Sequence, residues 1–317
     1  MKKITALTIL IITSFLLIGC QKREIEYTDN NPIRIDMQNE TLKILQITDL
    51  HLTYGIDYND QKTFRLIEQL AKNDTYDLII ITGDLTMSPQ GPHLFRRLIK
   101  TMENIKIPWT FIFGNHETDF HDYQAFLKEI KNTTYLKFKV GPKLEDGGVG
   151  NFKIEVMRDG GVFYNLYFLD TKAERKDYTP EQGEYDYLST AQVEWYRDYV
   201  VNDEAGSLIF MHIPLRQYMK AEEVGYDGYF KEDKVYAQGI DTGFFDAMVI
   251  HQKSIAVFVG HDHLNDFTFT YQDILLAYGR ATGYNAYGTL KKGGRHIEIN
   301  ATKTLTTFII EEDEVLK

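Results

Sequence analysis

From residue 41 onward the chain alternates short apolar runs with longer amphipathic segments. The apolar runs are nearly continuous, which is typical of strands in a sheet that is covered on both faces. We expect strands at residues 42–48, 77–82, 109–113, 153–157, 163–169, 208–211 and 255–259. Helical spacing is found at residues 62–72, 93–104, 123–131, 191–200 and 243–251. This alternation predicts an α/β protein.

Local signals refine this pattern. Ser189, with Gln192 three residues later, predicts a capping box at the start of a helix. Asp159-Gly160-Gly161 predicts a hairpin turn between two strands. Residues 172–188 and 214–241 have no strong periodicity and many Tyr, Glu and Asp residues, so we interpret them as insertions over one end of the sheet. They belong to a single domain predicted at residues 41–317.

The amino terminus has the pattern of an export signal. Lys2 and Lys3 precede an uncharged apolar run at residues 7–19, which is shorter than the roughly 18 apolar residues of a membrane-spanning helix. The run ends in Leu17-Ile18-Gly19-Cys20, which resembles the lipobox of bacterial lipoproteins, where lipid is attached to the cysteine.

We therefore expect residues 1–19 to be a lipoprotein signal peptide and residues 20–40 to be a polar tether. The folded domain would be held at the membrane by lipid on Cys20, on the extracytoplasmic face of a bacterial cell envelope. A simple secretory signal with a chance cysteine and an uncleaved anchor are the alternatives.

Composition narrows the function classes. The 317 residues contain 35 Lys and Arg against 46 Asp and Glu, a net charge of -11, and a single cysteine. One cysteine excludes a disulfide scaffold. Nucleic-acid backbones are bound through clustered basic side chains, and no basic stripe is present. No nucleic-acid partner is expected, whereas a small phosphorylated substrate remains open because bound metal ions can invert the local charge.

Potential metal ligands follow five of the predicted strands. The carboxyl ends of strands in α/β sheets converge on the ligand site, so side chains far apart in sequence can meet there. Carboxylate, amide and imidazole donors together suit Mn, Fe or Zn rather than Ca. The motifs are Asp49-x-His51, Gly83-Asp84, Gly114-Asn115-His116-Glu117, His212 and Gly260-His261-Asp262-His263.

In this order and spacing, the motifs resemble those of the calcineurin-like metallophosphoesterase superfamily, over residues 42 to about 290. The resemblance implies a four-layer α/β/β/α sandwich with a dinuclear metal centre. One metal would be held by Asp49, His51 and His263, the other by Asn115, His212 and His261, and Asp84 would bridge them. Such a centre activates a hydroxide for attack on a phosphate ester.

The resemblance also implies roles beside the ligands. His116 would face the leaving group as general acid, and Glu117 would orient His116. The segment Gly279–Tyr284 is similar to single-domain purple acid phosphatase-like proteins. Those phosphatases have a tyrosine ligand three residues after the bridging Asp, where this chain has Met87, so the charge-transfer colour should be absent.

Further candidates are weaker. His121 lies close to the Asn115 loop and could reach substrate, and Arg280 could bind a phosphate oxygen or form a structural ion pair. The remaining histidines, His93, His251 and His296, are expected at surfaces or element ends. Loop residues that could contact substrate are Arg175, Lys176, Tyr178, Tyr185 and Arg216.

Together these features predict a metal-dependent phosphoric ester hydrolase that acts on a small molecule. They leave open whether its substrate is a monoester or a diester. A catalytically idle, metal-containing surface lipoprotein that binds a ligand is the alternative from another class, and a nuclease is disfavoured by the charge.

Overall fold

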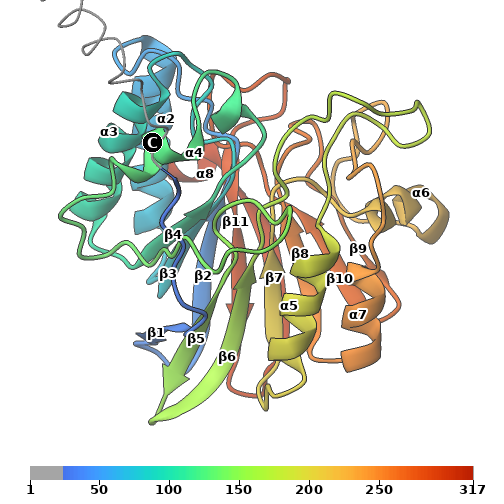
Figure 1. The fold of residues 1–317 in the computed structure, drawn as a ribbon. Helices are drawn as coiled ribbons and strands as arrows, with labels where there is room; N and C mark the ends of the chain where they lie inside the picture. Colours follow the sequence, from blue (N-terminus) through green and yellow to red (C-terminus); the bar gives the residue numbers. More distant parts are fainter. Residues whose placement is uncertain (1–23, 317) are drawn as a thin grey trace, which may run out of the picture.

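The computed structural model describes residues 24–316 as two β-sheets packed face to face between two layers of helices (Figure 1). One sheet has seven strands in the order β1-β5-β6-β7-β8-β10-β9 and the other has five in the order β12-β11-β2-β3-β4. The α/β prediction and the four-layer α/β/β/α architecture are confirmed. The predicted signal peptide and Cys20 lie outside the described residues.

The seven-stranded sheet is formed by β1 (Ile33–Asp36), β5 (Phe152–Arg158), β6 (Gly161–Phe168), β7 (Ser207–Phe210), β8 (Ser254–Val259), β10 (Ile274–Tyr278) and β9 (Thr268–Tyr271). The five-stranded sheet is formed by β12 (Leu305–Glu311), β11 (Gly293–Ile299), β2 (Leu42–Ile47), β3 (Leu78–Thr82) and β4 (Trp109–Ile112). Strands β2, β3 and β4 pair in parallel, as do β6, β7 and β8. The carboxyl ends within each parallel set therefore lie at one edge of its sheet.

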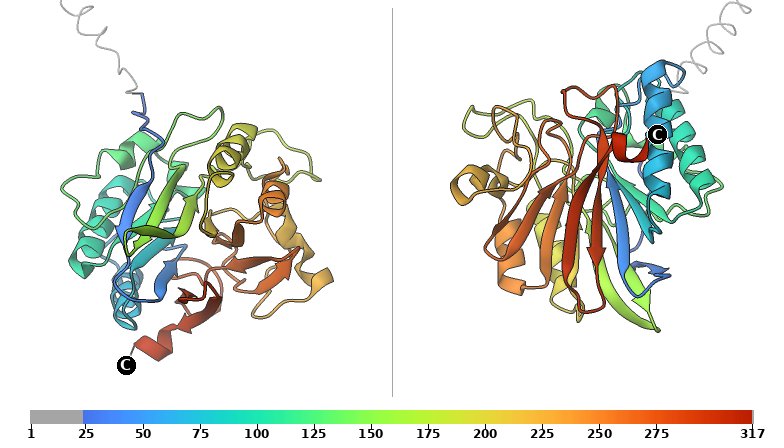
Figure 2. Two further views of the ribbon diagram at one scale, coloured as in Figure 1. Left: turned by 90° about the horizontal axis from the view of Figure 1, so that it is seen from below. Right: turned by 180° about the vertical axis from the view of Figure 1, so that it is seen from behind.

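The longer helices cover the outer faces of the sheets, as the two further views also show (Figure 2). They are α2 (Tyr58–Lys72), α3 (Gly91–Ile105), α5 (Thr190–Val200) and α7 (Phe244–His251). The shorter ones are α4 (Tyr123–Leu127), α6 (Ala221–Val224), α8 (Glu312–Val315), η1 (His116–Thr118) and η2 (Arg216–Lys220). The predicted capping box starts α5, since the Ser189 hydroxyl accepts from the Gln192 amide and the Gln192 side chain accepts from Ser189. No helix among residues 24–316 has the length and apolarity to cross a membrane.

Alternation along β2 explains the layers. Ile44 packs in the core between the sheets, whereas Leu45 packs in the core beneath α2 and α3. Successive side chains of a strand point to opposite faces, so a continuous apolar run serves both cores. Between the sheets, buried Gln46 donates to the Thr82 hydroxyl at 2.9 Å and to the Val259 carbonyl at 3.0 Å. This amide links β2 to β3 and β8 just below their carboxyl ends.

The structure contains strands that were not predicted from the sequence, in two parts of the chain. Residues 33–36, predicted as tether, form β1, which pairs in parallel with β5. The four strands in the carboxyl-terminal part of the chain, β9 to β12, were not predicted. Two of them carry alternating or polar residues, such as Arg295 and His296 of β11, and these two are buried only through tertiary packing. For the same reason the prediction of an exposed or terminal position for His296 is wrong: it is 3% exposed and stacks on Phe308.

Candidate metal centre

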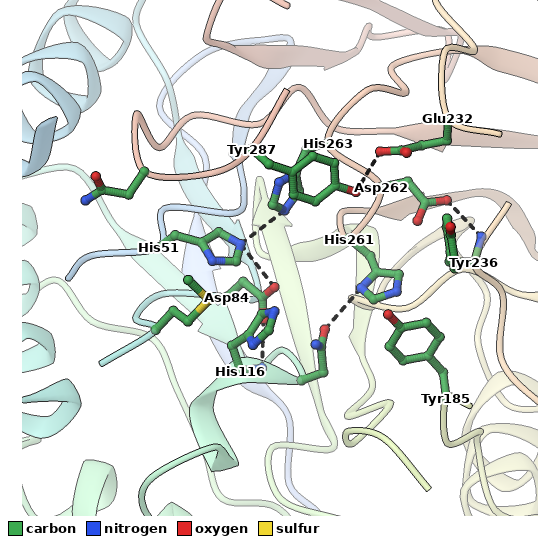
Figure 3. Close-up of a pocket in the computed structure, with 13 residues that line it drawn as sticks. His51, Asp84, His116, Tyr185, Glu232, Tyr236, His261, Asp262, His263 and Tyr287 are labelled. Atoms are coloured by element: carbon green, nitrogen blue, oxygen red, sulfur yellow. Dashed lines mark hydrogen bonds and ion pairs between the residues drawn. The ribbon is translucent and has the colours of Figure 1, made fainter. Parts of the chain in front are cut away.

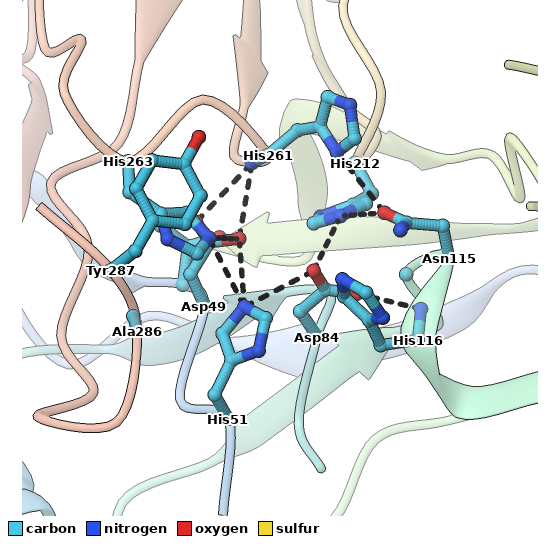
Figure 4. A network of polar contacts seen from close by, with 12 residues as sticks. Asp49, His51, Asp84, Asn115, His116, His212, His261, His263, Ala286 and Tyr287 are labelled. Atoms are coloured by element: carbon cyan, nitrogen blue, oxygen red, sulfur yellow. Dashed lines mark hydrogen bonds and ion pairs between the residues drawn. The ribbon is translucent and has the colours of Figure 1, made fainter. Parts of the chain in front are cut away.

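The predicted ligands lie together in a buried cluster at the carboxyl ends of five strands (Figure 4). Asp49 and His51 follow β2, Asp84 follows β3, Asn115 follows β4, His212 follows β7, and His261 and His263 follow β8. All seven are at most 7% exposed. Two groups of donors can each hold a cation: Asp49, His51, Asp84 and His263, and Asp84, His212 and His261.

Asp84 belongs to both groups. Its Oδ2 atom lies 3.3 Å from His51 Nε2 and 3.3 Å from His212 Nε2. The first group closes through His51 and His263, whose Nε2 atoms are 3.1 Å apart. In the second group Asn115 Oδ1 lies 3.0 Å from both His212 Nε2 and His261 Nδ1. The two clusters therefore share one carboxylate, as a dinuclear centre requires.

The backbone at the site is strained. Asp49, His51, Asp84 and His261 all have positive φ angles, of 52°, 44°, 51° and 81°. Non-glycine residues rarely adopt this conformation, and when they do they concentrate at functional sites. The strain turns each side chain back from its strand end toward the shared centre.

Two glycines allow the loops to approach closely. A Cβ atom on Gly114 would lie 2.2 Å from Asp84 Oδ1, and one on Gly83 would lie 2.3 Å from His212 Nδ1. Both distances are far below van der Waals contact, so a larger residue would displace a ligand. The glycines of these motifs are thus required by packing around Asp84 and His212.

The protonation states suit cation binding. Burial opposes ionisation of Asp49, but the neighbouring His263 outweighs it and lowers the pKa of Asp49 to about 2. Burial and the charge of His212 lower the pKa of His261 to about 3, so its imidazole is a neutral donor. Burial also disfavours charge on His212, yet the Asp84 carboxylate raises its pKa to about 10. A cation in the second cluster would displace that proton, since a metal ligand must be the neutral imidazole.

Hydrogen bonds outside the clusters orient two ligands. His212 Nδ1 lies 2.7 Å from the Thr82 carbonyl and donates to it, which leaves Nε2 free to accept a metal. Asn115 Nδ2 donates to Glu174 Oε1 at 3.0 Å, which aims Oδ1 at the second cluster. Glu174 belongs to the insertion at residues 172–188, and no motif in the sequence points to it.

Carboxylate, amide and imidazole donors without thiolate fit Mn, Fe or Zn. The fit also rests on the direction of the imidazoles, since His51 Nε2 and His263 Nε2 lie 3.1 Å apart and His261 Nδ1 lies 3.0 Å from Asn115 Oδ1. The residues present therefore match a dinuclear centre, and its metals are not determined by this geometry.

His116 lies at the edge of the cluster. Its backbone N–H donates to Asp84 Oδ1 at 3.1 Å, and its ring is edge-on to His51 with centroids 5.2 Å apart. The ring nitrogen Nδ1 lies 2.8 Å from Asp119 Oδ2. Burial opposes the imidazolium, but Asp84 and Asp119 together raise the pKa of His116 above its usual value. A protonated imidazole held beside the centre can donate a proton to a leaving group.

Glu117 does not orient His116, as the sequence reading expected. Its buried carboxylate accepts from the backbone N–H groups of Thr86 at 2.9 Å and Gly114 at 2.7 Å. Glu117 therefore joins the loops after β3 and β4. The residue that orients His116 is Asp119 instead. A carboxylate three residues after His116 was a signal in the sequence that could have found Asp119.

Arg280 and His121 lie outside the cavity above the centre. Arg280 is 2% exposed and forms ion pairs with Asp266 and Glu311, so of the two roles considered for it the structural ion pair is the observed one. His121 Nε2 donates to the Pro89 carbonyl at 2.8 Å. The expectation that these two contact substrate is therefore not supported.

One of the five loop candidates reaches the cavity (Figure 3). Tyr185 lines it, with its ring edge-on to His261 at 4.3 Å between centroids. Arg216 instead donates to backbone carbonyls of Gln182, Gln238 and Gly239. Arg175, Lys176 and Tyr178 do not line the cavity. The lining residues that the sequence reading missed as site residues are Glu232, Tyr236, Asp262, Asn285 and Tyr287.

Comparison with known proteins identifies the family of this chain. The model of the calcineurin-like phosphoesterase family matches residues 42–265. The chain belongs to that family.

Several named proteins are similar in sequence. The chain is 24% identical to a probable inactive purple acid phosphatase 28 of Arabidopsis thaliana, over 88% of this chain and 79% of that protein. It is 29% identical to phosphatase DCR2 of Saccharomyces cerevisiae, over 75% of this chain and 47% of that protein. It is 32% identical to a probable cyclic nucleotide phosphodiesterase of Psychrobacter arcticus, over 54% and 59% of the two chains.

Solved structures share the fold. A dimetal phosphatase from Danio rerio aligns with a TM-score of 0.59 at 9% identity, covering 86% of this chain and 96% of that one. The purple acid phosphatase PPD1 of yellow lupin aligns with a TM-score of 0.54 at 13% identity, covering 88% and 52%. At such low identities the likeness concerns the fold.

Proposed function

We propose that this protein is a metal-dependent hydrolase of small phosphate esters. The observation that carries the proposal is the shared position of Asp84, 3.3 Å from the imidazoles of His51 and His212, with His116 beside it. A pair of metal ions at such a centre supplies Lewis-acid activation of water and neutralises phosphoryl oxygens. Asp49, His51, Asp84, Asn115, His212, His261 and His263 would hold the ions.

The chain's own residues contribute the remaining steps. Asp119 accepts a hydrogen bond from His116 Nδ1 and so favours the protonated ring. The proton on the other ring nitrogen, Nε2, is the one that His116 delivers to the leaving alkoxide. Glu174 keeps Asn115 aimed at the second cluster. The Tyr185 and Tyr287 side chains stand against His261 and His263 and form walls of the cavity.

An experiment distinguishes a catalytically active hydrolase from an idle binding protein. The names of related proteins include phosphatases, cyclic nucleotide phosphodiesterases and phosphatases called inactive. In this chain the complete set of ligand types beside His116 supports catalysis over an idle binding protein. We would measure Mn²⁺-dependent hydrolysis of p-nitrophenyl phosphate and bis(p-nitrophenyl) phosphate, with a chelator control. Asn115→Ala should lose metal and activity together, and full activity in that variant would contradict the assignment.

We also propose that Cys20 carries lipid and holds the domain on the extracytoplasmic face of a bacterial cell envelope. The proposal rests on Leu17-Ile18-Gly19-Cys20 at the end of the apolar run. Cys20→Ser should move the protein from the membrane fraction to the soluble fraction. Persistent membrane association of that variant would show an uncleaved apolar anchor instead.

A further inference from the structure

The cavity above the metal clusters has an unusual charge for a phosphate-binding site. It has a volume of about 430 Å³, and neither Lys nor Arg is among its lining residues. Besides the predicted metal ligands and His116, the side chains that line it are Met87, Tyr185, Glu232, Tyr236, Asp262, Asn285 and Tyr287. Phosphate recognition by proteins normally recruits Arg or Lys. Here the lining contributes carboxylates and tyrosines instead.

Glu232 is the carboxylate at the mouth of this cavity (Figure 3). Its Oε1 atom accepts from the Tyr287 hydroxyl at 2.6 Å and from the Leu264 N–H at 3.1 Å. Within residues 24–316 no Lys, Arg or His lies within ion-pair distance of it. The neighbouring Lys231 and Lys234 extend over the rings of Tyr229 and Tyr236, at 4.3 Å and 4.6 Å from the centroids.

The Tyr287 ring lies between Glu232 and His263, a residue of the metal clusters. The Tyr287 ring stacks on His263 with centroids 4.1 Å apart, and 52% of this residue is exposed. Tyr185 stands against His261 on the other side of the cavity. Glu232 is therefore one tyrosine side chain away from a metal ligand. A group within that reach of the centre would belong to the same substrate molecule as the phosphate.

Two other carboxylates line the cavity, but Asp84 belongs to the metal clusters and Asp262 accepts from the Tyr278 hydroxyl and the Tyr236 N–H. Glu232, which belongs to neither metal cluster and has no basic partner in the described part of the chain, repels an anionic substrate unless the substrate itself carries positive charge. A cation would meet the Glu232 carboxylate and the faces of tyrosine rings, which attract cations through the ring quadrupole. We propose that this cavity selects phosphate esters whose alcohol carries an ammonium group a few bonds from phosphorus, with Glu232 as charge partner and Tyr185 and Tyr287 as walls. The proposal rests on the proposed hydrolase function.

The test compares two chromogenic diesters that differ in one charge. They are p-nitrophenyl phosphorylcholine and its isostere p-nitrophenyl 3,3-dimethylbutyl phosphate. In the isostere an uncharged carbon replaces the ammonium nitrogen of the alcohol. In both, water attacks phosphorus and the P–O bond to p-nitrophenolate breaks, so the reporter is the same. We expect kcat/KM of the Mn²⁺-loaded protein to be about tenfold higher for the choline ester, a factor between those of an exposed and a desolvated cation–π contact. Equal kcat/KM for the two esters would overturn the proposal.

A variant pair separates recognition from structure. Glu232→Gln should bring the ratio of the two kcat/KM values toward one, whereas Glu222→Gln, an exposed carboxylate of the same insertion, should leave the ratio unchanged. A ratio that persists in Glu232→Gln would assign Glu232 to support of the Leu264 loop and overturn its role. Hydrolysis of p-nitrophenyl phosphate without any preference for the cation would reject this inference alone. Metal-loaded protein idle on all of these esters would reject the proposed function as well.

Discussion

Asn115 donates a hydrogen bond from its amide nitrogen to Glu174 Oε1 at 3.0 Å, although the two residues are 59 positions apart. The amide oxygen of Asn115 is thereby turned toward His212 and His261. A loop with no periodic pattern thus supports the metal centre from outside. Partners of this kind fix a ligand in the geometry that the metal needs.

Removing this partner should weaken metal binding. Glu174→Ala is expected to lower affinity at the second cluster by about 10- to 100-fold, as loss of such outer partners does. Isothermal titration with Mn²⁺ or Zn²⁺ measures this. Glu184→Ala, at a half-buried carboxylate of the same insertion, is the matched control. Unchanged affinity in Glu174→Ala would show that Asn115 is oriented by packing alone.

His116 should be needed for turnover and dispensable for metal. His116→Ala is expected to retain bound metal and to lower kcat by about 10² to 10⁴, the usual size of general acid assistance. The loss should be larger for phenyl phosphate than for p-nitrophenyl phosphate, because a poor leaving group needs the proton more. Metal content and the two rates are measured on one preparation. Equal losses with both esters would remove His116 from the general acid role.

Asp119 should act only through His116, since its carboxylate lies 2.8 Å from Nδ1 of that ring. Asp119→Asn is expected to slow turnover less than His116→Ala does. The double variant should be no slower than His116→Ala alone, because residues that act as a unit are not additive. Additive losses in kcat would show that Asp119 has an independent role.

Glu117 should stabilise the fold. In Glu117→Ala the buried N–H groups of Thr86 and Gly114 lose their acceptor. An unsatisfied buried donor costs about 1–3 kcal/mol, so the loss of an acceptor for two donors should decrease the free energy of unfolding by about 2–6 kcal/mol. Urea unfolding, with the exposed Glu145→Ala as control, measures it. A change below about 1 kcal/mol would indicate that the two loops relax to find water.

Asp170 should make stability depend on pH. It is fully buried, and burial raises its pKa from 3.8 to about 6. The folded state therefore binds the proton more tightly than the unfolded state. The resulting stability is complete below about pH 4 and is lost as the pH rises through 6, by up to about 3 kcal/mol.

The Asp170→Asn variant isolates this effect because asparagine does not titrate. Relative to that variant, the wild type should lose stability between pH 4.5 and about 7. Urea unfolding at several pH values gives the difference in free energy, and the exposed Asp159→Asn serves as control. A difference that stays constant across this range would show that Asp170 titrates normally.

The sequence by itself determined the architecture and the ligand types. Continuous apolar runs ending in Asp, Asn and His indicated covered strands with polar residues at one edge, because strand burial leaves a strong local pattern. Only the tertiary structure decided the roles of the polar residues other than the metal ligands. In the folded protein Arg280 forms an ion pair and Glu117 joins two loops by hydrogen bonds. Glu174 and Glu232 lie at the site. Isolated charged side chains in aperiodic loops carry no local signal, and their roles arise from neighbours that the fold brings from elsewhere in the chain.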